Sequence, residues 1–319
     1  MAFPPFNPAP WWRNAHLQTA WPALFRRVPV TPPRRERIFT PDEDFLDLDW
    51  HRGGHSRLLI ISHGLEGSSR RPYVLGLARE ALASGWDVLA WNFRSCSGEI
   101  NRQPHFYHSG ETKDLGLVVR HGLAQGYERI ALSGFSIGGN MTLVYLGKPD
   151  EEVPPQVRGA VVFSVPCDLA GSADRLARSA NRVYMHRFVR LLSAKMRRKH
   201  QQFPEQIDLD GLRALRTFHQ FDDRYTAPLH GFANARDYWD RCSSAQFIPG
   251  IRLPVLIVNA LDDPFLSPEC FPRAQTTGNP RVVLETPRHG GHVGFMERPG
   301  KKGYWSEKRS LAFLNDGHG

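Results

Sequence analysis

A serine between two glycines is the first feature of this sequence that could support chemistry. The pentapeptide Gly134–Gly138, centred on Ser136, follows a short apolar run, Arg129 to Leu132, and precedes a helical pattern from Asn140 to Leu146. A strand, a sharp turn with this glycine spacing and a helix form a nucleophile elbow. The glycines are needed because a Cβ two residues before or after the serine would collide with neighbouring backbone. The alternative is an ordinary turn with an incidental serine.

A serine nucleophile needs a base and an acid, and candidates for both lie later in the chain. A serine hydroxyl is a poor nucleophile at neutral pH unless a general base takes its proton and an acid orients that base. Asp262 and Asp263 follow the penultimate predicted strand, and His289 and His292 follow the last. The order serine, acid, histidine is the order found in enzymes with this elbow.

Each role has two candidates, and the local sequence favours one of them. We prefer Asp263 as the acid because it directly precedes the turn Pro264–Leu266, which leaves Asp262 to point away or tie down the loop. An Asp-Asp-Pro sequence can equally form only a turn. We prefer His292 as the base because its small neighbours let the imidazole reach the serine, whereas His289 could be a loop residue bonded to backbone.

An oxyanion hole should accompany the elbow. One donor is the amide of the residue after the nucleophile, Ile137, and the other comes from the loop after the first parallel strand, where Leu65 is the expected donor. His63 lies in the same loop but precedes the serine in the chain. We therefore expect His63 to brace the loop rather than act as the base.

Short strands and helices alternate along most of the chain. Strand patterns occupy 37–39, 45–50, 57–61, 87–91, 129–132, 159–163, 255–259 and 281–284, and helical patterns occupy 72–84, 111–125, 140–146 and 305–314. The first two strands flank a turn and predict a hairpin. The alternation predicts an α/β fold whose mainly parallel sheet carries helices on both faces. Ligands of such sheets bind beyond the carboxyl ends of the strands, where all the candidate residues fall.

Four segments follow from this pattern. We expect an irregular, Pro-rich and aromatic N-terminal arm over 1–36, a first part of the core over 37–169, and a second part over 249–319. The intervening segment, 170–248, has little strand pattern, and we expect an inserted helical cap over the active edge of the sheet.

Composition excludes several classes of protein. The chain has 319 residues, 41% of them hydrophobic and 23% charged, which suits a globular domain of ordinary composition. The four cysteines are far apart and form no C-x-x-C pair, which argues against a zinc site and a disulfide framework. Neither a signal peptide nor a long apolar stretch is visible. We expect a cytoplasmic protein without a metal or organic cofactor; the oligomeric state stays open.

Basic residues gather in one segment of the predicted cap. The formal net charge is +9, and residues 174–200 contain nine Arg or Lys against one Asp. We favour a solvated helix face, with an apolar side built from Leu176, Ala180, Val183, Tyr184, Leu191 and Leu192. The second hypothesis is peripheral contact with an anionic membrane surface. Nucleic acid is disfavoured because no recognised binding motif accompanies the charge.

Longer motifs resemble one family. The motifs are Trp11–Thr19 with the sequence His-Leu-Gln-Thr, His63–Gly67, Asn92–Arg102, Tyr107–Thr112, Gly134–Asn140 and Asn259–Pro264. Together they resemble the YheT-like branch of the α/β-hydrolases, also called AB hydrolase family four. The resemblance runs from the N-terminal arm to the last histidine. Two small residues depart from the family pattern: Ser95 and Ala15 stand where glycine is usual.

The resemblance implies an α/β-hydrolase fold and a serine hydrolase of carboxylic esters, with a triad on Ser136, Asp263 and His292. Eukaryotic relatives act on lipid-like acyl esters, so acyl esters are the expected substrates. An acyltransferase or thioesterase would use the same site. A catalytically silent membrane-surface or partner-binding module is a third hypothesis, against which the intact triad argues. The resemblance leaves the motif around Cys96 and 107–112 unexplained; we expect mainly a structural network there, with a substrate-facing role as the alternative.

Overall fold

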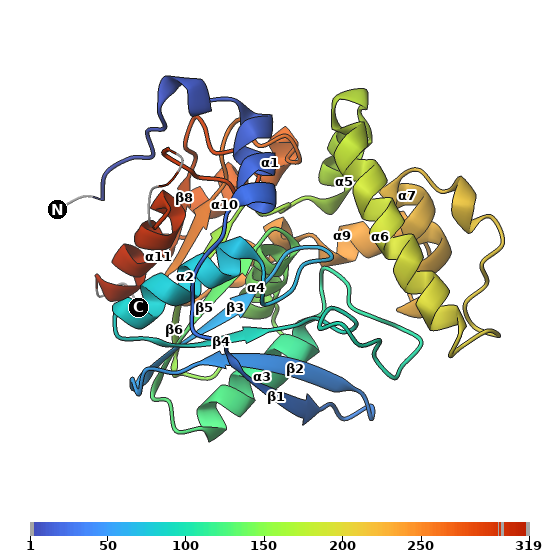
Figure 1. The fold of residues 1–319 in the computed structure, drawn as a ribbon, viewed down its shortest axis with the longest axis horizontal. Helices are drawn as coiled ribbons and strands as arrows, with labels where there is room; N and C mark the ends of the chain where they lie inside the picture. The colour runs from blue at the N-terminus through green and yellow to red at the C-terminus, as the bar shows by residue number, and fades with distance from the viewer. Residues whose placement is uncertain (1–2, 299, 301–302, 317–319) are drawn as a thin grey trace.

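An eight-stranded sheet lies at the centre of the computed structural model, which describes residues 3–298, 300 and 303–316 (Figure 1). The strand order is β1-β2-β4-β3-β5-β6-β7-β8; β2 is antiparallel to both β1 and β4, and all other neighbours are parallel. The strands are β1 Arg34–Phe39, β2 Phe45–His51, β3 Arg57–Ser62, β4 Asp87–Trp91, β5 Arg129–Phe135, β6 Val157–Phe163, β7 Val255–Val258 and β8 Val282–Glu285. The predicted mainly parallel sheet and its hairpin are confirmed.

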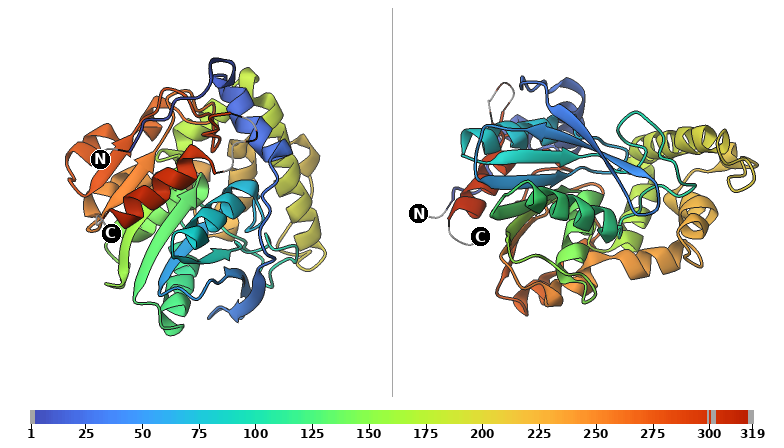
Figure 2. Two further views of the ribbon diagram at one scale, coloured as in Figure 1. Left: turned by 60° about the vertical axis from the view of Figure 1, so that its left-hand side comes forward. Right: turned by 90° about the horizontal axis from the view of Figure 1, so that it is seen from below.

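Helices cover both faces of the sheet (Figure 2). The α-helices are α1 Ala15–Phe25, α2 Pro72–Ala83, α3 Thr112–Ala124, α4 Ile137–Gly147, α5 Leu169–Ala177, α6 Arg182–His200, α7 Phe218–Phe221, α8 Ala227–Leu229, α9 Ala235–Cys242, α10 Arg273–Thr277 and α11 Trp305–Asn315. Shorter helical turns are Pro10–Trp12, Ser179–Asn181, Leu212–Ala214, Asp222–Thr226, Ser244–Gly250 and Pro268–Cys270. Helices α2 and α11 pack on one face, and α3 and α4 on the other.

The apolar strands are buried on both faces, and their sequences are therefore continuous hydrophobic runs. In β3, Leu58 and Ile60 point into the core beneath α3 and α4, whereas Leu59 and Ile61 point into the core beneath α2 and α11. This alternation is the two-residue period of a strand. The two cores hold the sheet rigid, so the loops at its carboxyl edge have fixed starting points.

The segment between β6 and β7 contains α5 to α9, which we call the cap. In Figure 1 the cap lies at the right of the molecule, beyond the ends of the parallel strands. Its small apolar cluster includes Leu169 and Ala173 of α5 and Tyr238 and Trp239 of α9.

The expectation of an irregular N-terminal arm was wrong for residues 15–25, which form α1. Asn14 caps this helix, since its side-chain oxygen accepts a hydrogen bond from the Leu17 amide at 3.0 Å. Pro22 lies inside the helix and made the segment look non-helical. Strand β1 also begins at Arg34, within the predicted arm.

The expected apolar side of the basic segment is confirmed at Leu176 and Leu192, which are buried, and was wrong at Ala180 and Val183, which are exposed. The helix is broken between Ala177 and Arg182 by a short turn at Ser179–Asn181. The residues of α6 therefore do not continue the helical faces of α5. Val183 is therefore 71% exposed, and the buried apolar side chains of α6 are Met185, Val189, Leu192 and Met196. Lys195 and Lys199, predicted to belong to a solvated face, are buried. Burial lowers the pKa of Lys199 to about 7, and its Nζ donates to the Gln103 carbonyl at 2.6 Å.

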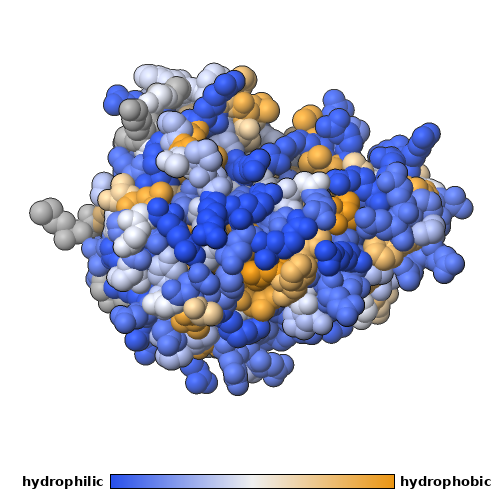
Figure 3. All heavy atoms as spheres, turned by 60° about the horizontal axis from the view of Figure 1, so that its bottom comes forward, coloured by the Kyte–Doolittle hydropathy of each residue, from blue (hydrophilic) through white to orange (hydrophobic). Residues whose placement is uncertain are grey.

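Among the described residues, no helix is both long and apolar enough to cross a membrane. The four cysteines are unpaired, as expected from their spacing. Figure 3 turns the lower side of Figure 1 forward and shows a mainly hydrophilic face with scattered apolar patches. Several large apolar side chains that are exposed lie on and beside α1: Trp11, Leu17, Trp21, Leu24 and Phe25.

Candidate active site

Ser136 occupies the sharp turn between β5 and α4, in the left-handed region with φ of 55°. A Cβ on Gly134 would collide with the backbone of Gly138, and a Cβ on Gly138 would collide with the carbonyl of His63. Both glycines are therefore required by close backbone approach, as the sequence pattern predicted. The strained φ is typical of a functional turn held in place by its surroundings.

His292 and Asp263 lie together at the same edge of the sheet. The His292 Nδ1 atom is 2.9 Å from one Asp263 carboxylate oxygen and 3.1 Å from the other. The Asp263 side chain is fully buried and also accepts the Phe265 amide at 2.9 Å. A buried carboxylate at Nδ1 directs the second ring nitrogen, Nε2, outward as a proton acceptor.

Asp262, the alternative acid, has different partners. Its carboxylate accepts the Gly291 amide at 2.9 Å and lies 3.3 Å from Nδ1 of His289. Burial raises the pKa of Asp262. Asp262 and His289 thus hold the loop that carries His292, and neither lines the cavity at Ser136.

The two expected oxyanion donors flank the serine. Ile137 is the first residue of α4, where backbone amides have no partner within the helix. In the loop after β3, the Gly64 amide donates to the Tyr73 hydroxyl and the Glu66 amide donates to the Tyr107 hydroxyl. The Leu65 amide between them has no acceptor among the described residues. Two backbone donors are therefore available beside Ser136.

His63 braces this loop from within the core. Its Nδ1 donates to the Gly64 carbonyl at 2.8 Å, and its Nε2 accepts the Phe93 amide at 3.1 Å. Burial lowers the pKa of His63 to about 3, so the imidazole is neutral. Both ring nitrogens are occupied, which leaves none for catalysis.

A narrow cavity of about 90 Å³ joins these groups. It is lined by Ser136, His292, Leu65 and Ile137, and the cap completes its wall. The cap side chains that line it are mainly apolar and include Leu169, Ala173, Leu176, Phe188, Leu192 and Trp239. Phe265 lies against the His292 ring, with centroids 4.2 Å apart. Ser136 and His292 therefore share one cavity with mainly apolar side chains of the cap.

Sequence reasoning missed the support that α1 gives to the His292 loop. Thr19 accepts the His292 amide at 2.9 Å, and the buried Gln18 side chain bonds both the amide and the carbonyl of Met296, each at 2.8 Å. A Cβ on Gly291 or on Gly294 would collide with the backbone of α1. The signal was present, because Gln18 and Thr19 belong to the His-Leu-Gln-Thr motif.

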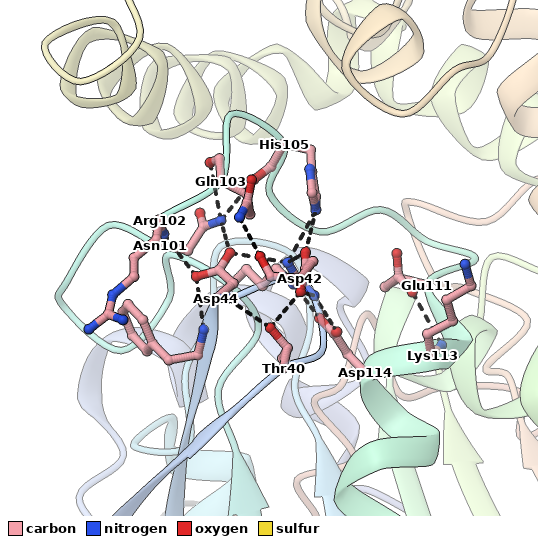
Figure 4. Close-up of polar contacts among 12 residues, drawn as sticks. Thr40, Asp42, Asp44, Asn101, Arg102, Gln103, His105, Glu111, Lys113 and Asp114 are labelled. Carbon is pink, nitrogen blue, oxygen red and sulfur yellow. Dashed lines mark hydrogen bonds and ion pairs between the residues drawn. The ribbon is translucent and has the colours of Figure 1, made fainter.

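The motif around Cys96 builds a buried polar network (Figure 4). Arg94 forms paired hydrogen bonds with Asp114, each 2.8 Å, and also contacts Asp42 and Asp44. Ser95 has a φ of 65°, which explains why glycine is usual there; its hydroxyl compensates by donating to Asn101 at 2.5 Å. This part of the motif is structural.

The following stretch, 107–112, connects the elbow to the cap. Asn140 of α4 donates to the carbonyls of Ser109 at 2.9 Å and Cys242 at 2.8 Å. The Tyr238 hydroxyl donates to the Ser109 hydroxyl at 2.8 Å. Tyr107, His108 and Ser109 also line the cavity at Ser136.

One buried ion pair links the cap to the oxyanion loop. Lys195 of α6 lies 2.5 Å from the Glu66 carboxylate, which also accepts the Tyr107 hydroxyl at 2.7 Å. The Lys195 and Glu66 side chains are 4% and 10% exposed. Because Glu66 follows Leu65 directly, this pair fixes the position of the loop that carries the second donor.

We expect Lys195→Met to lower the free energy of unfolding by about 3–5 kcal/mol, because it leaves the buried Glu66 carboxylate without its charged partner. Adding Glu66→Gln to this variant should restore part of the loss. Urea unfolding measures both, with the exposed Arg197→Gln as the control that changes little. A loss below about 1 kcal/mol for Lys195→Met would mean that the pair behaves like an exposed one.

Comparisons with known proteins agree with this architecture. The family described as "alpha/beta hydrolase fold" matches residues 57–299. The YheT protein of Escherichia coli is 38% identical over 91% of this chain and 87% of its own length. Phospholipase ABHD3 of Mus musculus is 29% identical over 92% of this chain and 73% of its own length. The monoacylglycerol lipase of Saccharomyces cerevisiae is 30% identical over 87% of this chain and 64% of its own length. The Pyrococcus furiosus esterase Pf2001 shares the fold, with a TM-score of 0.60 at 19% identity over 100% and 98% of the two chains.

Proposed function

We propose that this chain, which belongs to the YheT-like branch of the α/β-hydrolase superfamily, is a serine hydrolase of carboxylic acyl esters. The observation that carries the proposal is the cavity where Ser136 and His292 meet, with the buried Asp263 behind His292. Membership in the family gives the hydrolase class, and the chemistry is argued from the site itself.

The proposed reaction passes through an acyl-enzyme. The Ser136 hydroxyl attacks the ester carbonyl while His292 accepts its proton, and Asp263 stabilises the resulting imidazolium. The Ile137 and Leu65 amides donate to the developing oxyanion. His292 then protonates the departing alcohol. A water molecule, activated by the same histidine, releases the acid and regenerates Ser136.

A lipid-like acyl chain is the proposed substrate feature. The cap supplies a mainly apolar wall with a few polar side chains, among them Ser172, Asp222 and Thr226, and the named relatives include a phospholipase and a monoacylglycerol lipase. We propose residues 170–248 as the inserted segment, one residue inside the start of α5 at Leu169. We propose the cytoplasm as the compartment, which the unpaired cysteines support.

A fluorophosphonate probe and an ester series test the proposal. The probe should label wild-type protein at Ser136, and p-nitrophenyl esters of increasing chain length should be hydrolysed with a preference set by the apolar cavity. Absence of labelling would favour a silent binding module. Acyl transfer to an added alcohol or thiol in preference to water would favour the acyltransferase alternative, which uses the same acyl-enzyme.

We also propose contact with an anionic membrane surface, through α1 together with basic residues of the segment first considered. The exposed Trp21, Leu24 and Phe25 give α1 an unusually apolar outer face. His16, in the first turn of α1, contacts the Tyr184 hydroxyl at 3.2 Å, so the start of α1 adjoins the start of α6, where Val183 is also exposed. Exposed arginines of α6, including Arg182, Arg187 and Arg190, lie along the same helix. Apolar insertion beside basic residues is the pattern of interfacial binding.

Leu24→Ser combined with Phe25→Ser should sharply reduce binding to vesicles that contain phosphatidylserine. Replacing Arg182, Arg187 and Arg190 by Gln should weaken binding by about 1 kcal/mol per charge at low salt, and less at high salt. Vesicle sedimentation measures both effects. Phe39→Ser is the matched control, since Phe39 is 63% exposed on β1, away from α1. Equal loss in the Phe39 variant would remove α1 as the contact surface.

A further inference from the structure

A second, wider cavity of about 510 Å³ lies on the other side of His108 from the serine. One wall is the loop before α3, which contributes His105, His108 and Glu111. The opposite wall comes from the cap, with His230 at the end of α8 and Cys242 at the end of α9. Neither Ser136 nor His292 lines this cavity, so it is separate from the proposed ester site.

Three side chains converge in this cavity with the geometry of a ligand set. Each of His108, Glu111 and His230 offers one possible ligand atom, and these three atoms lie within 4.8 Å of one another. The His108 Nε2 atom is 3.5 Å from a Glu111 carboxylate oxygen, and the His108 and His230 rings are 4.7 Å apart between centroids. The other Glu111 oxygen caps α3 by accepting the Lys113 amide at 3.2 Å, which orients the carboxylate.

The Nε2 atom of His230 is buried and has no hydrogen-bond partner among the described residues. An unsatisfied buried polar atom is costly, and most such atoms have an explanation. A neutral imidazole and an ionised carboxylate are the protonation states that bind metals.

We propose that His108, Glu111 and His230 bind a divalent zinc-class ion that fastens the cap to the core. Two imidazoles and one carboxylate form a known zinc ligand set with a fourth position open. The open position suits water or an anion, because Lys113, Lys148 and Arg241 line the same cavity. The ion would hold the stretch 107–111, which also borders the acyl cavity, against the end of α8.

Binding requires a proton to move within His108. Its Nδ1 accepts the Gly110 amide at 3.1 Å, which places the ring proton on Nε2. Coordination through Nε2 moves that proton to Nδ1, and the resulting N–H can donate a hydrogen bond to the Cys242 sulfur, 3.7 Å away. The Gly110 amide loses its acceptor, so we expect weaker binding than in a site with a preset tautomer. The Cys242 sulfur lies at Nδ1 of His108, whereas Glu111 lies at Nε2, so Cys242 is not counted as a ligand.

Titration of the chelator-treated full chain with zinc chloride, followed by calorimetry and thermal unfolding, tests the site. We expect one tight equivalent and a rise in Tm. His230→Ala and Glu111→Gln should each weaken that equivalent by at least about tenfold. His105→Gln, in the same cavity, should leave the affinity nearly unchanged, and Ser136→Ala should bind zinc like wild type.

Near-UV circular dichroism checks that each variant is folded. Glu111→Gln keeps the shape of the side chain and provides a second test if His230→Ala is unstable. Zinc bound equally by wild type and both ligand variants would place the metal at other histidines and overturn the proposal. Absence of a tight equivalent in wild type would also overturn it. Because zinc binding is measured without an ester, neither result depends on the proposed hydrolase activity.

Discussion

Ser136→Ala should lower the turnover of a p-nitrophenyl ester by about a millionfold while leaving the fold intact. The alanine methyl fits wherever the serine Cβ fits, and the positive φ of the turn is held by the two glycine contacts and by the bond from the residue 136 amide to the Phe163 carbonyl at 2.9 Å. The loss is this large because the acyl-enzyme cannot form without the hydroxyl. Residual rate would come only from the oxyanion donors and substrate binding.

Steady-state kinetics with fluorophosphonate labelling measures this effect. Thermal unfolding should show a Tm close to wild type, which separates lost chemistry from lost structure. Ser133→Ala is the matched control, since Ser133 is a buried serine of β5 that does not line the cavity. If Ser136→Ala kept more than a few per cent of the activity, Ser136 would not be the nucleophile.

Asp263→Asn should reduce turnover by about ten-thousandfold, far more than Asp262→Asn. The Phe265 amide donates to one Asp263 oxygen, so the asparagine oxygen will stay there and its NH₂ group will face Nδ1 of His292. An N–H aimed at Nδ1 makes that nitrogen the acceptor and leaves the ring proton on Nε2. His292 then cannot take the proton of Ser136.

Asp262→Asn serves as the control because it changes the neighbouring carboxylate. Its oxygen can still accept the Gly291 amide, so we expect only a loosened loop and a modest loss of activity. The comparison is made from kcat on a soluble short-chain ester, together with urea unfolding. Equal losses in the two variants, or a larger loss for Asp262→Asn, would reverse the assignment of the acid.

Local features of the sequence were enough to predict the framework. Buried parallel strands have continuous apolar runs, so β3, β4 and β5 were recognised without any tertiary information. The elbow was equally local, because the reason for Gly134 and Gly138 is contact within and beside one turn. Chain order then limited the acid and the base to residues after two particular strands.

The tertiary structure decided two kinds of contact. One kind joins residues that are distant in the sequence, and the other depends on which way the side chains of adjacent residues point. Asp262 and Asp263 are adjacent, and the course of one loop gives one of them to His289 and Gly291 and the other to His292. A charge pattern cannot show which lysines of a helix face meet a partner, so the burial of Lys195 against Glu66 was missed.

The same physical reason applies to α1 and to the second cavity. Thr19 supports His292 from more than 270 positions away in the sequence. Pro22 made the helix that carries Thr19 hard to recognise from the sequence. His230 joins His108 and Glu111 only because the cap folds back over the loop before α3. The sequence by itself therefore determined the sheet, the elbow and the candidate catalytic residues, whose signals are local. Only tertiary packing decided which distant side chains support them, because such contacts leave no period or spacing in one sequence.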